Sequence, residues 1–210
     1  PLGKNVSFDQ GALIEPLAVG MHAVREHKVN EDSVIAIIGC GTIGLGVLLS
    51  AKRFNPKKII AIDVVDFNLE KAKEMGADVV FNSGKCDLVE EVKKLTDGVG
   101  VDAAIDITGA GPAINASLRS VRAAGKLVCV GLPTKNVEMD MANDLIYREV
   151  EVTGVSGRKI WETWTDFAKV MKGPYYNLDK VMGNRFALKD FEQAIAQIES
   201  GVPGKMILYP

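Results

Sequence analysis

One continuous run, Val34–Asp63, constrains the fold of this chain more than any other feature. It begins with the apolar stretch VIAII, passes through a glycine-rich turn and a long apolar stretch, and ends in a second apolar run closed by an acid. A short, uniformly apolar stretch is typical of a parallel strand that is covered on both faces. The run therefore predicts a buried strand, a tight turn, a helix and a second strand.

The glycines of the turn follow the pattern G-x-G-x-x-G at Gly39, Gly41 and Gly44. In this pattern the first glycine permits a sharp turn, the second lets backbone approach a pyrophosphate, and the third lets the helix pack on the strand. A helix that opens at Thr42 would direct free N–H groups and its positive dipole end at the same pyrophosphate. The spacing predicts a dinucleotide site. A glycine turn in an unrelated α/β protein is the alternative.

Asp63 closes the second strand, about 20 residues after the glycine turn, where a carboxylate can accept hydrogen bonds from ribose hydroxyls. A carboxylate about 4 Å from a 2′-phosphate charge would be repelled by up to about 4 kcal/mol at an effective dielectric near 20. Residues 64–68 contain no lysine or arginine that would offset this repulsion. The acid therefore predicts NAD rather than NADP as the cofactor.

Composition excludes several other classes of protein. The net charge of −2 and the pI near 5.8 give no reason to expect nucleic acid or an anionic membrane as a partner. The chain has no apolar stretch near the roughly 20 residues that span a bilayer, and no signal-peptide pattern at its start. Cys40, Cys86 and Cys129 are too dispersed to suggest a disulfide framework. We expect a cytoplasmic protein.

A rhythm of strand and helix continues along the chain from Ser33. Strands are expected at 34–38, 58–63, 79–81, 101–107, 126–131 and 151–155. Helices are expected at 42–54, 67–75, 86–95, 111–123 and 158–172. This alternation predicts an α/β fold, a doubly wound parallel six-stranded Rossmann sheet with strand order 3-2-1-4-5-6.

The two ends of the chain depart from this rhythm. Ser7 and Gln10 form the S-x-x-Q pattern of a capping box, which predicts a helix that begins near Phe8. We expect Glu15-Pro16 to interrupt that helix, with a second helical stretch at about 17–26.

After Met182 the pattern gives one apolar helical face and a short closing strand at Lys205–Leu208. The helical face consists of Phe191, Ala194, Ile195 and Ile198. These elements are not expected to add a seventh unit to the sheet.

Separate segments over essentially the whole chain share one family resemblance. They are GALIEPLAVGMHAV, VIAIIGCGTIGLG, AIDVVDFNLEKAKEMGAD, DITG, GKLVCVGLP and GRKIWETW. Together they resemble the zinc-containing medium-chain dehydrogenases. ALIEPLAV resembles the polyol (sorbitol-type) dehydrogenases, and the glycine-arginine pair followed by Glu162-Thr163-Trp164 resembles the threonine 3-dehydrogenases.

The resemblance implies a hydride transfer between a secondary alcohol and NAD, with zinc in the full-length enzyme. Family members carry a GroES-like catalytic domain with the zinc ligands before the segment that matches here, and this sequence contains none of those ligands. We therefore expect residues 1–25 and 183–210 to belong to a catalytic domain, and 26–182 to be the NAD-binding domain. No catalytic residue is expected within this chain, which should be inactive alone.

The resemblance also assigns the cofactor contacts. The pyrophosphate and adenosine side would be held by Gly39, Gly41, Thr42, Ile43, Gly44, Asp63 and Asn68. Family members often have a basic residue at the position of Asn68, so this contact is the weakest of the set. The nicotinamide side would be lined by Thr108, Gly109, Val130, Gly131, Leu132, Val155 and Ser156. Ordinary packing at strand ends is the alternative for this second set.

Glu15 is the metal candidate, because its position in the family faces the catalytic zinc, as a ligand or through the metal's water. In this chain a solvated glutamate at a helix end beside Pro16 is favoured. Glu15 and His22 would lie roughly 10 Å apart along a continuous helix, too far to share an ion bound at about 2.0–2.3 Å. We expect His22 to be a packed or capping histidine. Two interpretations of Arg158 stay open: its side chain contacts the cofactor phosphates, or it is a surface arginine at the start of a helix.

Two other functions stay open at this point. One is a non-catalytic Rossmann module that senses NAD(H). The other is an S-adenosylmethionine-dependent methyltransferase, which the glycine spacing and the VGLP and ETW segments disfavour. The resemblance also implies an alcohol substrate of unknown identity and a homo-oligomer paired through the sheet edge near 151–155.

Overall fold

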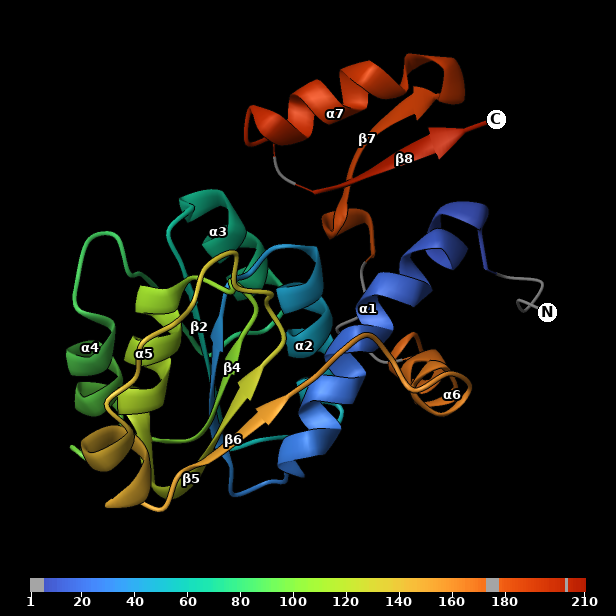
Figure 1. Ribbon diagram of the computed structural model, residues 1–210. Coiled ribbons are helices and arrows are strands. Elements are labelled where there is room, and N and C mark those ends of the chain that lie inside the picture. Colours follow the sequence, from blue (N-terminus) through green and yellow to red (C-terminus); the bar gives the residue numbers. More distant parts are fainter. Residues whose placement is uncertain (1–5, 173–177, 203) are drawn as a thin grey trace.

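The computed structural model describes residues 6–172, 178–202 and 204–210. Within these ranges the main sheet has six parallel strands in the order β3-β2-β1-β4-β5-β6, which confirms the predicted order (Figure 1). The strands are β1 Val34–Ile38, β2 Lys58–Asp63, β3 Val79–Asn82, β4 Val101–Asp106, β5 Val121–Cys129 and β6 Glu151–Gly154. Five of the six agree with the predicted strands to within one residue and β5 begins earlier than predicted, so the α/β class and the doubly wound sheet are confirmed.

Helices cover both faces of this sheet. The helices on one face are α1 Phe8–His27, α2 Thr42–Lys52, α3 Asp66–Glu74 and α6 Glu162–Val170. The helices on the other face are α4 Leu88–Leu95 and α5 Gly111–Ser120. Neighbouring residues of β1 divide between the two cores: Ile35 and Ile37 pack with the first group, Ala36 and Ile38 with the second. Burial on both faces explains why the strand is apolar throughout rather than alternating.

The N-terminal helix corrects one prediction. The capping box is confirmed, because the Gln10 amide donates to Ser7 Oγ and the Ser7 amide donates to Gln10 Oε1, both at 3.1 Å. The predicted interruption is wrong, because α1 is one continuous helix with Pro16 inside it. A proline inside a helix costs about 3 kcal/mol, whereas burying a leucine side chain contributes about 1.5–3 kcal/mol. Leu13 and Leu17 flank Pro16 and are fully buried, so packing holds the helix together.

Two glycines set the contact between α1 and α2. A Cβ atom on Gly20 would lie 2.3 Å from the carbonyl carbon of Gly46, and one on Gly46 would lie 3.0 Å from the Cα of Leu17. The two backbones therefore meet closely, and α1 forms part of the core layer.

The boundary between α5 and β5 also differs from the prediction. The expected helix ran to residue 123 and the strand from 126, whereas α5 ends at Ser120 and β5 begins at Val121. Val121 is paired with Val101 of β4, and both side chains are fully buried. The early pairing ends the helix, and this partner is distant in the sequence. A π-helix at Met141–Ile146 was not predicted either.

The C-terminal elements do not extend the six-stranded sheet, as predicted. Strands β7 Met182–Ala187 and β8 Lys205–Tyr209 make a two-stranded parallel sheet, with α7 Phe191–Glu199 between them in sequence. Figure 1 shows these elements apart from the six-stranded sheet. The sequence MGNRFA has no apolar run, which is why β7 was missed. In the described part of the chain no helix is long and apolar enough to cross a membrane.

Candidate functional site

The glycine turn between β1 and α2 uses its three glycines for three different reasons. Gly39 has φ of 93°, in the left-handed region, and its N–H donates to the Ile62 carbonyl at 2.8 Å. A Cβ atom on Gly44 would lie 1.8 Å from the carbonyl oxygen of Gly39, so the helix closes tightly on the turn. A Cβ atom on Gly41 would meet none of the described heavy atoms within 4 Å. Space beside the backbone at Gly41 is therefore open.

Asp63 holds this turn from the end of β2. The buried carboxylate accepts from the Cys40 amide at 2.6 Å and from the Val65 amide at 2.9 Å. The Asn68 side-chain amide donates to the same carboxylate at 3.1 Å. The acid therefore fixes the glycine turn of the neighbouring strand. Asn68 contacts this carboxylate, and its neutral amide does not neutralise the negative charge.

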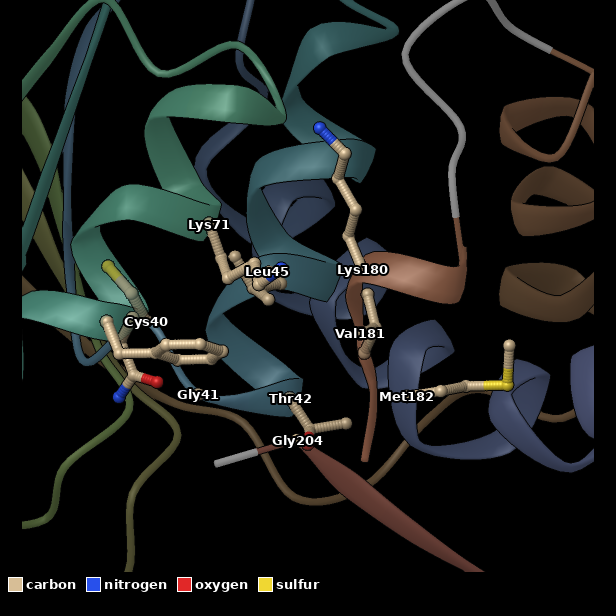
Figure 2. A pocket seen from close by; sticks show the side chains of 11 residues that line it. Cys40, Gly41, Thr42, Leu45, Lys71, Lys180, Val181, Met182 and Gly204 are labelled. Carbon is tan, nitrogen blue, oxygen red and sulfur yellow. The ribbon is translucent and has the colours of Figure 1, made fainter. Parts of the chain in front are cut away.

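A small cavity opens against the glycine turn (Figure 2). It is lined by Cys40, Gly41, Thr42, Leu45, Phe67, Asn68, Lys71, Lys180, Val181, Met182 and Gly204. The turn, the first half of α3 and the segment around the start of β7 thus enclose one space. Lys71 lies one helical turn after Phe67, with its Nζ 5.2 Å from the centre of the ring. Neither residue was among the predicted contacts, although their i, i+4 spacing shortly after Asp63 is a signal in the sequence.

A second buried carboxylate organises the end of β4. Asp106 is fully buried and accepts from Thr108 Oγ1 at 2.8 Å and from the Gly109 amide at 3.0 Å. Its main-chain carbonyl accepts from the amides of Val130 and Gly131 at 2.8 and 3.1 Å. Burial raises the pKa of Asp106, and the hydrogen bonds from Thr108 and Gly109 oppose that rise. Asp106 was not predicted as a site residue, yet it joins both loops.

The predicted residues of the second set lie together at the carboxyl ends of β4, β5 and β6. A Cβ atom on Gly131 would lie 2.1 Å from the Gly109 nitrogen, so the two loops are in direct contact. Val155 is buried and its amide donates to the Cys129 carbonyl at 2.8 Å. The residues exposed beside them are Thr108, Leu132 and Ser156.

Both predicted sets therefore lie at the carboxyl ends of the parallel strands, on the same side of the sheet. Thr42 and Ile43 are partly buried in the first turn of α2, beside the open space at Gly41. In open α/β sheets, ligands bind in the crevice outside the carboxyl ends of the strands. The arrangement can receive an extended ligand across the carboxyl ends of the strands. The glycine turn would contact one part of the ligand, and the loops after β4, β5 and β6 would contact another.

Glu15 has a different environment from the one expected. It lies inside α1 rather than at a helix end, and its Oε1 is 2.8 Å from Arg158 Nη1. The guanidinium carbon of Arg158 lies 5.6 Å from the centre of the Trp164 ring, within cation–π range. The half-exposed carboxylate thus has a cationic partner, and the partly buried Arg158 side chain pairs with Glu15 and Trp164.

The residues described do not form a metal site by themselves. Across 6–172, 178–202 and 204–210, no group of three or more His, Cys, Asp or Glu side chains is arranged to hold an ion. Glu15 pairs with Arg158, and His22 Nδ1 lies 3.0 Å from the Gly157 carbonyl oxygen. A zinc ion would need at least three further ligands beside Glu15.

Comparison with known proteins is consistent with this geometry. Residues 42–173 match the family model of zinc-binding dehydrogenases. The L-threonine 3-dehydrogenase of Bacillus velezensis is 34% identical over 196 residues, which cover 93% of this chain and 56% of that protein. The L-threonine 3-dehydrogenase of Pyrococcus abyssi is 32% identical over 205 residues, covering 97% of this chain and 59% of that protein.

Among solved structures, the 2R,3R-butanediol dehydrogenase of Bacillus subtilis is similar with a TM-score of 0.89 and 31% sequence identity. The match covers 100% of this chain and 60% of that chain. The chain thus spans less than two thirds of the length of these relatives.

Proposed function

The chain belongs to the zinc-binding dehydrogenase family, and from this premise we propose that it binds NAD(H) and forms the cofactor-binding part of an NAD-dependent alcohol dehydrogenase. The nicotinamide would supply the chemistry by accepting or donating a hydride. The residues of this chain bind and orient the cofactor. They do not themselves supply the acid–base or metal chemistry of the alcohol.

The observation that carries the proposal is the open space at Gly41 between two crowded glycines. Helix α2 begins directly after Gly41, which caps it without a side-chain hydrogen bond, and a helix N-terminus favours a phosphate group. Gly39, Gly41, Thr42, Ile43 and Gly44 would hold the pyrophosphate there. A pyrophosphate can contact the backbone only where no side chain intervenes. A methyl group at Gly41 would narrow the space that this contact requires.

Asp63 would accept hydrogen bonds from the adenosine ribose. Its carboxylate is already ordered by the Cys40 and Val65 amides, so it is positioned before the ligand arrives. Asn68 adds a neutral donor and no positive charge, which supports NAD over NADP. The nicotinamide would then lie along the ends of β4, β5 and β6, against Thr108, Gly109, Val130, Gly131, Leu132, Val155 and Ser156.

The substrate of the whole enzyme is proposed by class. The relatives are named for L-threonine and 2R,3R-butanediol, whose reacting group is a secondary alcohol. Zinc would polarise the alcohol oxygen as a Lewis acid in a full-length enzyme. The described residues do not assemble that zinc site, and Glu15 would contribute to it only beside ligands from elsewhere.

Isothermal titration calorimetry with NADH, NADPH and S-adenosylmethionine tests the cofactor. We expect NADH to bind. NADPH should bind at least about a hundredfold less tightly, because the charge on Asp63 repels its 2′-phosphate. Tight binding of S-adenosylmethionine alone would make the chain a methyltransferase and overturn the proposal.

A second measurement separates a cofactor-binding part from a complete enzyme. We expect the chain alone to form no NADH from threonine, sorbitol or butanediol in the presence of NAD and zinc. Robust turnover would refute the proposed incompleteness. A longer form of the protein that carries a zinc-ligand segment should be active, whereas an inactive longer form would favour a non-catalytic NAD(H)-sensing module.

A further inference from the structure

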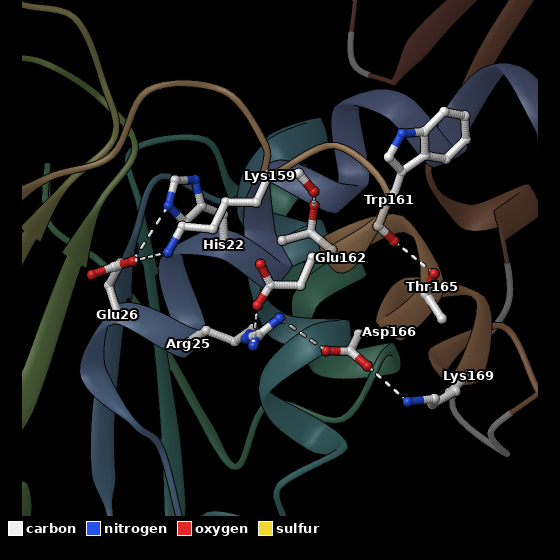
Figure 3. Close-up of polar contacts among 10 residues, drawn as sticks. His22, Arg25, Glu26, Lys159, Trp161, Glu162, Thr165, Asp166 and Lys169 are labelled. Atoms are coloured by element: carbon white, nitrogen blue, oxygen red, sulfur yellow. Dashed lines mark hydrogen bonds and ion pairs between the residues drawn. The ribbon is translucent and has the colours of Figure 1, made fainter.

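Residues 155–161, between β6 and α6, are fastened to α1 by polar side chains (Figure 3). Lys159 Nζ lies 2.7 Å from Glu26 Oε1, and His22 Nδ1 lies 3.0 Å from the Gly157 carbonyl oxygen. Beyond this segment, Arg25 of α1 pairs with Glu162 and Asp166 of α6. Among these contacts, that of His22 reaches the main chain of the segment rather than a side chain.

The surroundings of His22 fix how its ring is oriented. The side chain is 12% exposed, and Nε2 lies 3.4 Å from Glu26 Oε1. The hydrogen bond from Lys159 holds the pKa of Glu26 below its ordinary value, so this carboxylate is charged at neutral pH. A carbonyl oxygen can only accept, so the Nδ1–H group donates to Gly157. A neutral imidazole has a single N–H group, which this bond uses, so Nε2 pairs with Glu26 only in the imidazolium form and the contact with Gly157 is the one that both forms make.

The carbonyl that His22 holds lies directly beside the candidate site. Gly157 follows Val155 and Ser156, which lie at the carboxyl end of β6. Gly157 is exposed and has φ of 60°, a conformation that is easily lost without an anchor. In a doubly wound sheet each half binds one mononucleotide, so the β4–β6 half faces the nucleotide that does not lie on the glycine turn.

We propose that His22 is a positioning residue for the nicotinamide half of the cofactor, because its bond to the Gly157 carbonyl keeps Ser156 and Val155 in place along the crevice. This inference rests on the proposed function, since it assumes that NAD(H) binds across the carboxyl ends of the strands. It goes beyond that function by assigning a role to a residue on a helix that lies outside the crevice.

Two substitutions of similar size test the role. In His22→Asn the side-chain amide takes the place of Nδ1 and can still donate to Gly157, whereas in His22→Gln the amide lies near the position of Nε2, toward Glu26. The ligands are NADH and ADP-ribose, which lacks nicotinamide, and dissociation constants are measured by calorimetry on the full chain. We expect H22Q to weaken NADH about three- to tenfold, the value of one hydrogen bond. ADP-ribose should bind H22Q as it binds the wild type, and H22N should retain NADH affinity.

Other outcomes overturn the inference. An equal loss of NADH and ADP-ribose in H22Q would mean a general effect on the fold, and unchanged NADH binding in H22Q would mean that the loop needs no such anchor. If H22Q does not fold, His22→Ala is the second variant, because it removes the donor to Gly157 without placing an amide beside Glu26, and the same selective loss of NADH is expected. A wild-type chain that binds neither ligand would refute the proposed function itself. A wild type that binds both, with a variant that shows no selective loss of NADH, would refute only the role of His22.

Discussion

At the scale of single residues, two buried aspartates perform the same task in the two halves of the sheet. Asp63 ends β2 and accepts from the Cys40 amide of the glycine turn, and Asp106 ends β4 and accepts from the Gly109 amide of its own turn. A carboxylate that accepts backbone N–H groups orders a loop that would otherwise have unsatisfied donors. Both crevice loops are therefore preorganised by strand-end acids.

The glycine turn gives a prediction with an internal control. Gly41→Ala should fold with nearly wild-type stability, because Gly41 has φ of −68° and open space at its Cβ position. NADH affinity should fall, because the methyl group takes the space proposed for the pyrophosphate. Gly44→Ala should instead lose about 3 kcal/mol or more of unfolding free energy through its clash with Gly39. Urea denaturation and calorimetry measure both effects, and wild-type NADH affinity in G41A would contradict the assignment.

The cysteines give a prediction about pH. Burial raises the pKa of the Cys40 thiol to about 12 and that of Cys129 to about 11, from an ordinary value of 9.0. Because the thiolate is the reactive form, iodoacetamide at pH 8 should modify partly exposed Cys86 first, and Cys129 about a hundredfold more slowly than an unfolded thiol.

The sign for stability follows from the same shifts. The folded state holds these protons more tightly than the unfolded chain, so both thiols lower the unfolding free energy as the pH rises above about 9. Mass spectrometry of the alkylated peptides gives the order of reaction. Equal labelling rates for Cys40 and Cys86 in the folded protein would show that Cys40 is not buried.

At the scale of elements, α1 depends on its packing more than on its sequence. Its proline favours a break, yet Leu13, Leu17 and Met21 are fully buried against the rest of the core. Its polar side reaches the segment before α6 through Glu15 and His22. One helix thus contacts the sheet layer on one side and the crevice loop on another.

The contact between α1 and α2 predicts a ranked pair of substitutions. Gly20→Ala should destabilise the fold by about 3 kcal/mol, the upper part of the usual range for overpacking, because its Cβ would lie 2.3 Å from backbone atoms that cannot move independently. Gly46→Ala should cost less, because its nearest neighbour is 3.0 Å away. Alanine's higher helix propensity offsets about 1 kcal/mol of each loss. Thermal unfolding of both variants measures the order, and a G20A variant as stable as the wild type would mean that the helices are not in close contact.

At the scale of the whole molecule, the six-stranded sheet has one edge that concerns assembly. Strand β6 is last in the strand order, and Val152 on it is 42% exposed. An open strand edge offers unpaired backbone groups to another strand, and charged side chains are the usual protection against such pairing. A second copy of this chain, paired edge to edge through β6, is the assembly we propose.

This assembly predicts the effect of a charge on the edge. Analytical ultracentrifugation should find a dimer for the wild type and a monomer for Val152→Lys, because desolvating a lysine ammonium at the interface opposes association. Glu149→Lys, in the turn before β6, serves as the control for added charge and should remain dimeric. A wild type that remains monomeric at concentrations near 100 μM, about the dissociation constant of a weak association, would contradict pairing through this edge.

The sequence by itself determined the central segment of this protein, which consists of β1, the glycine turn, α2, β2 and Asp63. Each of these elements depends on neighbours in the chain: uniform apolar runs for buried strands, and glycines at fixed spacing for a turn that packs on its own strand. The strand order followed from the alternation of strands and helices. The positions of Thr108, Gly109 and Val130–Leu132 at strand ends could be predicted for the same reason.

Only the tertiary structure decided the features that depend on distant partners. Pro16 stays helical because of leucines packed on α2, and β5 begins early because Val121 meets Val101. The bond from His22 to Gly157 joins residues 135 positions apart, and no local pattern announces it. Local spacing specifies which groups are available, whereas the free energy of packing decides which of them meet.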